Sequence, residues 1–434
     1  MAVRPLPLTG FVHTTVFIPK AWVGRWRSAT PLRIGLIGKT NAGKTTLFNS
    51  MTLLSGEVSN YPFTTKAPET GVANVVTLCV HKEFGVVDSP ANSKCDDGWR
   101  FIPVELTDLP GLIKGAWMGK GLGNQFLSVA AQSDALLHVV DASGSVDKDG
   151  RISEPGTGDP LADFADVELE LVLWYTKLFT QNLPKISKLS KTPGYGIPAA
   201  VEEVMHGIGV RKEHVIAAMR EALLEDKSFD SWSEKDSQAF CWSLREYSKP
   251  TLLIANKMDL PFAAENFQRL REKYKGLIVV PTSGEAELTL RRAEHKGLIR
   301  YVPGEERFEI LKPQDLNDAQ KSALAYIRRK VFGEYLRTGV QFALNSVVFK
   351  LLRENAVYPI ADPQKLTDKS GRILPDVYLL PSGSTVEDLA THIHTDLAKG
   401  LLYAVDARTG LHLPTNYVLR DRDVLSIVST AKET

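Results

Sequence analysis

Short apolar runs, each ending in polar or glycine-containing residues, recur along the first two thirds of the chain. Residues 34–37, 136–141, 252–255 and 277–280 each have the length and composition of a buried strand. Between residue 32 and about residue 145 such runs alternate with helical patterns. Because strands that alternate with helices form parallel sheets covered on both faces, the pattern predicts an α/β fold with a mostly parallel sheet.

A long helical pattern follows a linker-like cluster of glycines and prolines between residues 144 and 160. Apolar residues then recur at three- and four-residue steps, and acids gather near the start of the pattern, where the helix dipole favours them. We therefore predict a helical insert over residues 151–240, between two strands of the sheet. The periodic apolar residues are Phe164, Val167, Leu171, Trp174 and Leu178, followed by Val215, Met219 and Leu223.

The last third of the chain changes character twice. Apolar residues at helical spacing predict a helical bridge, and from Val357 onward short strands with proline and glycine turns surround one predicted helix, Val386–Lys399. His392 and His394 lie two apart on that helix and would point to different faces, so we do not expect a metal pair. The predicted divisions are a basic N-terminal extension (1–31), two parts of the sheet domain (32–150 and 241–312), the insert (151–240), the bridge (313–355) and a small C-terminal domain (356–431).

Composition narrows the class of protein. The 434 residues carry a formal net charge of +1, with 24% charged and 43% hydrophobic residues, as in an ordinary globular protein. This balance gives no sign of a DNA sequence reader. No apolar run approaches the roughly 20 residues that cross a bilayer, so we expect no membrane partner. Cys79, Cys95 and Cys241 form no Cys-x-x-Cys motif, which argues against a disulfide framework or a zinc site and favours the cytoplasm.

Two basic segments allow more than one interpretation. No acidic residue precedes Glu57, whereas several basic residues do. A transit peptide is one interpretation of this segment, but its prolines break any long amphipathic helix, and we favour an extension particular to this chain. The lysines of the insert, among them Lys185 and Lys188, form either a solvated face, which we favour, or an RNA-facing surface.

The first predicted strand runs into a glycine loop and then into the start of a helix. The loop is Gly38-Lys39-Thr40-Asn41-Ala42-Gly43-Lys44-Thr45, followed by Thr46. Strand, glycine loop and helix are the context of a phosphate-binding loop, in which glycines let backbone N–H groups turn inward around a phosphate. Lys44 is expected to reach the β- and γ-phosphates, and the Thr45 hydroxyl to ligate Mg²⁺. A plain glycine turn is the alternative.

Two more segments predict the surroundings of the phosphates. Asp108 and Gly111 form an Asp-x-x-Gly motif, in which Asp108 would hold the metal through water and Gly111 would offer its N–H to the γ-phosphate. Between this motif and the glycine loop, Thr64 or Thr65 can lend a hydroxyl to Mg²⁺ only while the γ-phosphate is present, which would make the segment a switch. We favour Thr65 for this role, and a turn or surface loop is the alternative for either motif.

The run at residues 252–255 ends in Asn256-Lys257-Met258-Asp259. The carboxylate of Asp259 can accept hydrogen bonds from both N1–H and the 2-amino group of guanine, a pair of donors that adenine lacks, so it predicts guanine specificity. Asn256 would bond the other edge of the purine, and the stem of Lys257 would lie along the base. The backbone of Ser283 and Gly284 would contact guanine O6. A helix N-cap with solvated charges is the alternative for the Asn-Lys-x-Asp motif.

Together these residues resemble the Obg/YchF family of translation-factor-class GTPases, from residue 32 to about residue 430. The likeness is carried by residues 38–46, by Tyr61-Pro62-Phe63-Thr64-Thr65, and by the stretch from Asp108 to Asn124, and it is strongest to the archaeal and fungal branch related to YchF. YchF itself departs from Asn-Lys-x-Asp and prefers ATP, whereas Asp259 places this chain nearer the guanine-specific side. Residues 375–410 resemble a TGS domain, which in relatives belongs to proteins that act on ribosomes or tRNA.

The resemblance implies a P-loop NTPase three-layer sandwich with a helical insert and a C-terminal ubiquitin-like β-grasp (TGS) domain. Leu112 stands where Ras-type GTPases place a Gln that orients water, and Leu has no group for that task. The family resemblance implies a class with a hydrophobic residue there. In many such GTPases an Asn of the phosphate loop helps to hold K⁺, and Asn41 occupies the matching position. Potassium dependence is therefore our hypothesis, and a bond from Asn41 to its own loop is the alternative.

The sequence thus predicts a Mg²⁺-dependent switch that hydrolyses GTP to GDP and phosphate. Because it shows no obvious base or arginine finger, we expect slow turnover that a partner accelerates. We expect a monomer whose partner is the ribosome, rRNA or tRNA. The alternatives are a nucleotide-gated RNA- or ribosome-binding module with little turnover, and a YchF-like ATPase. The residues expected in catalysis are Lys44, Thr65, Gly111 and Asn41, and those expected at the metal are Thr45, Thr65 and Asp108.

Overall fold

The structure is a computed structural model that describes residues 31–53, 68–111, 114–118 and 123–430. The predicted N-terminal extension up to residue 30 lies outside these residues. So do Leu112 and the predicted switch threonines, Thr64 and Thr65.

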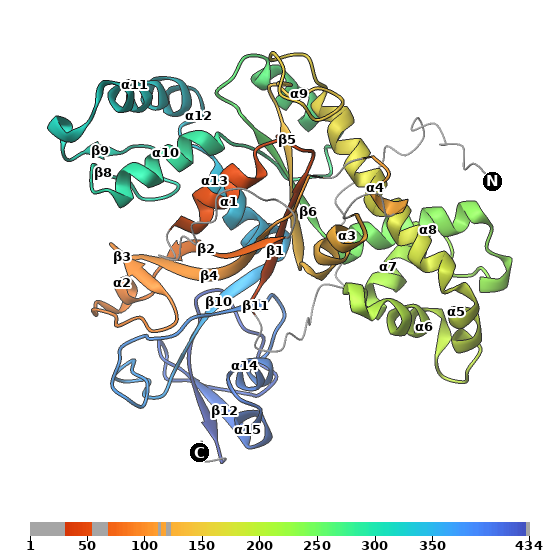
Figure 1. Cartoon of the computed structure of the whole chain (residues 1–434). Helices are drawn as coiled ribbons and strands as arrows, with labels where there is room; N and C mark the ends of the chain where they lie inside the picture. The colour runs from red at the N-terminus through yellow and green to blue at the C-terminus, as the bar shows by residue number, and fades with distance from the viewer. Residues whose placement is uncertain (1–30, 54–67, 112–113, 119–122, 431–434) are drawn as a thin grey trace.

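In the described part of the chain, seven strands form the central sheet. They are β1 (Arg33–Gly38), β2 (Glu69–Leu78), β3 (Lys94–Asp96), β4 (Trp99–Asp108), β5 (Ala135–Asp141), β6 (Thr251–Asn256) and β7 (Val279–Pro281). Their order is β2-β4-β1-β5-β6-β7, with β3 paired to β4 (Figure 1). β4, β1, β5, β6 and β7 run parallel, whereas β2 and β3 are antiparallel to β4. The predicted mostly parallel sheet is confirmed.

Helices cover both faces of this sheet. On one face, Ile34 and Leu36 of β1 pack in a core shared with α1 (Lys44–Thr52) and α13 (Val340–Asn345). On the other face, Ile37 packs in a core with α3 (Gly123–Gln132) and α4 (Pro160–Gln181). β6 packs against α9 (Ala263–Lys273), while α10 (Gly284–His295) lies beside α1. The three-layer sandwich predicted from the sequence is confirmed.

Five α-helices between β5 and β6 form a lobe beside the sheet (Figure 1, yellow to green). The lobe consists of α4, α5 (Leu183–Ser190), α6 (Gly196–Met205), α7 (Lys212–Glu221) and α8 (Glu234–Ser248). α4 begins where Asp159 accepts a hydrogen bond from the Leu161 N–H, with Pro160 in the first helical position. One predicted core position is wrong, because α7 ends before Leu223, which is 89% exposed, and Leu224 is buried in its place.

The helical bridge consists of two continuous helical runs, 318–335 and 340–351, and each contains a π-helical segment. It comprises α11 (Asp318–Tyr326), a π-helix (Ile327–Phe332), α12 (Gly333–Tyr335), α13 and a second π-helix (Ser346–Leu351). It follows α10 and a two-stranded hairpin of β8 (Ile299–Arg300) and β9 (Glu309–Ile310). Asn345 donates to Val76 O and accepts from Val76 N–H, each at 3.0 Å, so this helix satisfies part of the open edge of β2.

The C-terminal domain is a β-grasp. Its elements are β10 (Glu354–Ile360), β11 (Tyr378–Pro381), α14 (Val386–Ile393), α15 (Thr395–Lys399), β12 (Leu401–Asp406), β13 (His412–Leu413) and β14 (Val424–Ser429). The sheet order is β11-β10-β14-β12-β13, with β10 and β14 parallel at its centre. Buried side chains of α14 pack on this sheet. The predicted β-grasp domain is confirmed.

The prediction of a single helix over Val386–Lys399 is wrong, because the structure has two helices there. The backbone of His394 is extended, and its side chain accepts from the Asp396 N–H and caps a new helix, α15. His392 instead contacts the edge of the Tyr378 ring at 5.0 Å between ring centroids. The two histidines therefore have separate local roles.

None of the helices among the described residues combines the length and the apolar composition that spanning a bilayer requires.

Candidate nucleotide-binding site

Four loops meet at the carboxyl edge of the parallel strands. The glycine loop follows β1 and Ser283 follows β7, while Asp108 and Asn256 are the last residues of β4 and β6. Register brings them together, since Leu36 pairs with Asp108 and Asp141 pairs with Asn256. This edge is the usual ligand site of open parallel sheets.

Glycine is required at both ends of the glycine loop. Gly38 has φ +143°, and a Cβ there would lie 2.2 Å from Val139 O of β5. Gly43 has φ +98°, and a Cβ there would lie 2.2 Å from Asn256 Nδ2. A side chain at either position would clash and strain the backbone, so the loop retains its shape only with glycine.

Lys44 is buried in the first turn of α1, with 7% of its surface exposed. Its Nζ donates to Lys39 O at 2.8 Å, which holds the ammonium group inside the loop. Burial lowers the pKa of Lys44 to about 8, and the nearby carboxylate of Asp108 partly opposes this shift. The side chain is therefore positioned to meet an anion at the loop.

Thr45 and Asp108 form a pair beside Lys44. Thr45 Oγ1 donates to Asp108 Oδ2 at 2.6 Å, and burial raises the pKa of Asp108 despite this bond and the charge of Lys44. The second oxygen, Oδ1, is buried and has no hydrogen-bond partner among the described residues. Gly111 lies against the glycine loop, where a Cβ would come within 2.7 Å of Thr40 backbone atoms.

Asn256 ties two of the loops together. Its Nδ2 donates to Ala42 O at 3.0 Å, and its Oδ1 accepts from Thr282 Oγ1 at 3.1 Å and from the Gly284 N–H at 3.0 Å. A carboxamide nitrogen carries two N–H groups. One N–H group of Asn256 donates to Ala42 O. Only the second N–H group can therefore bond a purine, and that bond stays a prediction.

The side chain of Lys257 has partners in the protein, whereas the carboxylate of Asp259 has none among the described residues. Lys257 Nζ lies 2.9 Å from Asp141 Oδ2 and 3.1 Å from Ser145 Oγ, so its stem is fixed next to the loop. Asp259 is half-buried, and its backbone carbonyl accepts from Tyr326 Oη at 2.9 Å. No donor among the described residues bonds its carboxylate, which thus has both oxygens available to a ligand.

The backbone amides of Ser283 and Gly284 already have acceptors in the protein. Ser283 N–H donates to Thr338 O at 2.9 Å, and Gly284 N–H donates to Asn256 Oδ1. A guanine O6 at this position would therefore have to share these donors. This arrangement could not be predicted from the sequence, because Thr338 belongs to a distant segment.

The glycine loop makes two contacts, with the insert and with the segment that leads into it, that were not predicted from the sequence. Lys39 Nζ lies 2.6 Å from Asp163 Oδ1 on α4. Asn41 Nδ2 donates to Gly150 O at 2.9 Å, outside its own loop. Residues 144–158, predicted to be a linker, form backbone hydrogen bonds among themselves and lie over the glycine loop at Thr40; we call them the covering loop.

Three family models match the chain. Residues 33–159 match the model described as a 50S ribosome-binding GTPase. Residues 254–362 match an Obg-like GTPase model, described as YGR210-like and containing the G4 motif. Residues 366–429 match the TGS domain.

The curated relatives extend the match to almost the whole chain. An uncharacterized GTP-binding protein of Methanocaldococcus jannaschii is 40% identical over 399 residues, which cover 92% of this chain and 99% of that protein. The chain belongs to the Obg-like GTPase family. The resemblance inferred from the motifs is thereby confirmed. A second relative of the chain, the ribosome-binding ATPase YchF of Bacillus subtilis, is 31% identical over 61% of this chain and 69% of its own.

A solved structure supports the arrangement of the parts. The GTP-binding protein of Pyrococcus horikoshii OT3 superposes with a TM-score of 0.73 and 34% identity, covering 92% of this chain and all of its own. The fold of this chain is thus one already seen in a related GTP-binding protein.

Proposed function

We propose that this chain binds GTP with Mg²⁺ and hydrolyses it to GDP and phosphate as a molecular switch. The observation that carries the proposal is the 2.6 Å bond between Thr45 Oγ1 and Asp108 Oδ2, beside a buried lysine in a glycine loop. Burying a lysine and a carboxylate destabilises a fold unless partners offset the lost hydration. A magnesium triphosphate supplies partners for both groups.

Thr45 and Asp108 fit a divalent cation. Their hydroxyl and carboxylate oxygens are ligands of the kind that Mg²⁺ prefers, and Asp108 Oδ1 has no other partner among the described residues. Mg²⁺ bound there would neutralise charge on the phosphate oxygens. Thr65 is the further ligand that we propose for the triphosphate-bound state.

The chain's own groups then account for the chemistry. Lys44 and the backbone N–H groups of the loop, with that of Gly111, stabilise negative charge on the transferred phosphoryl group as water attacks in line. Leu112 cannot orient that water, so intrinsic turnover is slow. Asn41 uses Nδ2 on Gly150, and we propose its Oδ1 as a ligand of K⁺. Equal turnover in K⁺ and Na⁺ buffers would reject the potassium ligand.

The choice of guanine rests on Asp259. Its carboxylate is available to accept two hydrogen bonds, while Lys257 is held beside it by Asp141. A partner that offers only one donor, such as adenine, leaves an acceptor unpaired and costs several kcal/mol. An ATPase is the second candidate, since the related protein of B. subtilis is named a ribosome-binding ATPase.

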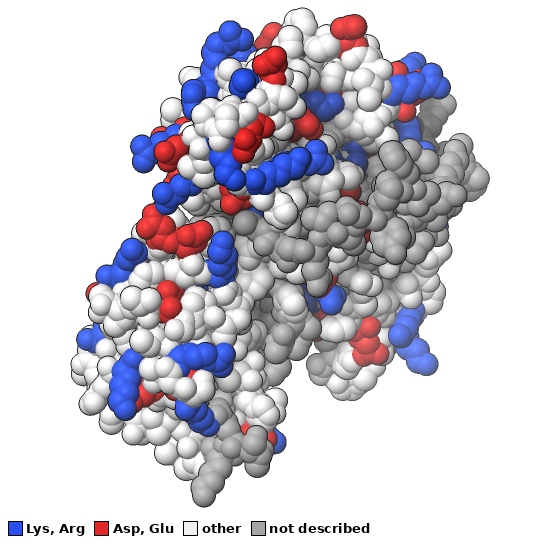
Figure 2. Space-filling model, turned by 60° about the vertical axis from the view of Figure 1, so that its left-hand side comes forward, with Lys and Arg blue, Asp and Glu red and all other residues white. Residues whose placement is uncertain are grey.

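We propose further that the switch acts on the ribosome in the cytoplasm, through rRNA or tRNA contacts, as a monomer. Support comes from the name of the B. subtilis relative, from the model that residues 33–159 match and from the TGS domain. On the face shown in Figure 2, Lys and Arg side chains alternate with Asp and Glu rather than forming one basic patch. Docking would then depend on shape and nucleotide state more than on net charge.

Steady-state GTP hydrolysis by matched lysine variants tests the enzymatic part. We expect Lys44→Ala to lose at least about a hundredfold in turnover, the usual effect of removing one charge-stabilising donor. Lys148→Ala, at an exposed lysine on the covering loop, should retain the wild-type rate. Wild-type turnover in Lys44→Ala would reject the site.

Co-sedimentation with ribosomal subunits tests the biological part. The switch predicts that association differs between a GTP analogue and GDP. Nucleotide-dependent association with negligible turnover would instead support a nucleotide-gated binding module. Absence of association in both states would reject the ribosomal partner while leaving the nucleotide site intact.

A further inference from the structure

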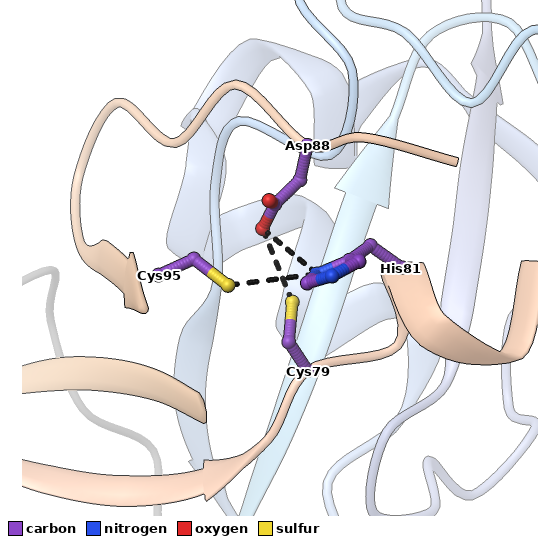
Figure 3. A group of neighbouring side chains, drawn as sticks. All are labelled: Cys79, His81, Asp88 and Cys95. Carbon is purple, nitrogen blue, oxygen red and sulfur yellow. Dashed lines mark hydrogen bonds and ion pairs between the residues drawn. The ribbon is translucent and has the colours of Figure 1, made fainter. Parts of the chain in front are cut away.

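Four side chains with metal-binding atoms meet at the far end of the β2–β4 ribbon, away from the nucleotide site. Cys79 directly follows β2, His81 begins α2 (His81–Phe84), Asp88 lies in the next loop and Cys95 lies on β3. Figure 3 shows all four side chains pointing toward one centre. The donor atoms all lie within 4.8 Å of one another.

Three of the six distances between these four atoms match the edges of a small tetrahedron, and the other three are at most 4.8 Å. Asp88 Oδ2 lies 3.2 Å from Cys79 Sγ and 3.3 Å from His81 Nδ1, and Cys95 Sγ lies 3.5 Å from His81 Nδ1. Zinc bonds of about 2.0 Å to N or O and about 2.3 Å to S place tetrahedral ligands roughly 3.3–3.8 Å apart. The four donors are therefore spaced to surround one zinc ion.

We propose that Cys79, His81, Asp88 and Cys95 form a structural Zn²⁺ site. Two thiolates and an imidazole favour zinc over Mg²⁺ or Ca²⁺, which prefer oxygen ligands. Four protein ligands close the coordination sphere, as in structural rather than catalytic zinc sites. The site is separate from the proposed GTP site, and its presence does not depend on nucleotide binding.

Arg100 bonds one of the proposed zinc ligands. Its side chain is fully buried, and Nη1 donates to Asp88 Oδ2 at 2.8 Å. Two thiolates and a carboxylate together exceed the charge of Zn²⁺ by one, and the guanidinium balances that charge. A residue that is hydrogen-bonded to a metal ligand also fixes the orientation of that ligand.

The loop that carries Asp88 also forms hydrogen bonds with the TGS domain. Ser89 and Ala91 donate their N–H groups to Ile373 O and Pro375 O, each at 2.8 Å. Arg100 Nη2 donates to Leu374 O and to Pro375 O, each at 2.9 Å. Zinc would fix the loop around Asp88, and this loop is the surface that contacts residues 373–375.

Ion pairs of α2 extend the same interface. Glu83, two residues after His81, pairs with Arg408 at 2.8 Å and with Arg422 at 2.7 Å, both in the C-terminal domain. The proposed zinc therefore anchors a loop and a helix that together contact the TGS domain. Its loss should loosen the contact between the two domains.

Metal content tests the proposal directly. The full-length protein, purified under reducing conditions without chelators, should contain one zinc per chain. Replacement by Co²⁺ should produce the absorption bands of tetrahedral cobalt with thiolate charge transfer. Absence of both zinc and these bands in the wild type would mean hydrogen-bonded thiols only and would overturn the proposal.

Matched cysteine variants locate the metal. Cys95→Ser should weaken zinc binding by at least about tenfold and reduce the thiolate bands, as loss of a zinc-site group does. Cys241→Ala, in the buried core of the helical lobe, should retain one zinc per chain. A strong chelator should lower the melting temperature of the wild type and of Cys241→Ala but leave that of Cys95→Ser almost unchanged. Equal zinc affinity and equal thiolate bands in both variants would overturn the assignment.

Discussion

Lys39 Nζ of the glycine loop lies 2.6 Å from Asp163 Oδ1 of α4, so the proposed phosphate site is bonded to the helical insert. Burial raises the pKa of Asp163, although the ion pair with Lys39 opposes this shift. The insert thereby places a negative charge near the position proposed for the triphosphate. Nucleotide binding and the position of the insert should therefore influence each other.

Replacing Asp163 by Asn should tighten GTP binding. Removing this charge relieves repulsion of the phosphates by roughly 1 kcal/mol, or about fivefold in Kd. Titration of GTP into Asp163→Asn measures the effect, and Asp166→Asn at an exposed position of the same helix is the control. Weaker binding in Asp163→Asn would show that the carboxylate mainly maintains the shape of the loop.

The lowered pKa of Lys44 predicts a pH dependence of nucleotide binding. Lys44 has a pKa of about 8 in the ligand-free protein, and bound phosphates would raise it by favouring the ammonium form. Binding near or above pH 8 should therefore take up a proton, and affinity should fall as pH rises further. Calorimetry in buffers of different ionisation enthalpy counts that proton. Zero uptake at pH 8 would indicate that phosphates do not contact Lys44.

Gly111→Ala should weaken GTP binding more than GDP binding. The new Cβ would lie 2.7 Å from the backbone of Thr40, so the Asp-x-x-Gly segment would have to move off the loop. Such overpacking costs about 1–3 kcal/mol. Fluorescence titration with labelled nucleotides measures the change, and Gly207→Ala, whose Cβ meets open space, is the control. Equal losses for GTP and GDP would contradict a role for Gly111 at the γ-phosphate.

The sequence was most informative where a motif is local. The loop from Gly38 to Thr45 and the strands around it follow from short-range patterns. The meeting of Thr45 and Asp108 follows from the rule that parallel strands end at one edge. The TGS domain was likewise recognisable from strands, turns and motif residues.

Contacts between distant segments were not predictable in this way. Asn41 meets Gly150, and Lys39 meets Asp163, only because the covering loop and α4 fold back on the glycine loop. The spacing of Cys79 and Cys95 argued against a zinc site, because the sequence does not show that β2 and β3 both pair with β4 and bring the two cysteines together. The Cys-x-His spacing at residues 79–81 was the one local signal available.

From the burial of His138 we predict a second pH effect, this time on the free energy of unfolding. His138 Nδ1 lies 3.0 Å from Glu168 Oε1, which also pairs with Arg245, and burial lowers the pKa of His138 below its ordinary 6.5. The unfolded chain therefore takes up a proton near pH 6.5 before the folded one does. Stability that is complete above pH 6.5 should fall as the pH drops further.

His138→Gln removes this titration and provides the comparison. Between about pH 6.5 and 5, wild-type unfolding free energy should fall more steeply than that of the variant, by up to about 1.4 kcal/mol per pH unit. Urea denaturation at a series of pH values measures both slopes. Identical slopes would show that His138 does not titrate on unfolding.

Calorimetric titration of wild type and Asp259→Asn with GTP, GDP and ATP in magnesium buffer tests the central claim most directly. Asp259 lies three residues beyond the end of β6, and its carboxylate has no partner among the described residues to lose, so the variant should fold normally. The account predicts that wild type binds both guanine nucleotides at least about a hundredfold more tightly than ATP, and that Asp259→Asn loses most of this preference. Absence of guanine-nucleotide binding, or equal discrimination in the variant, would contradict it.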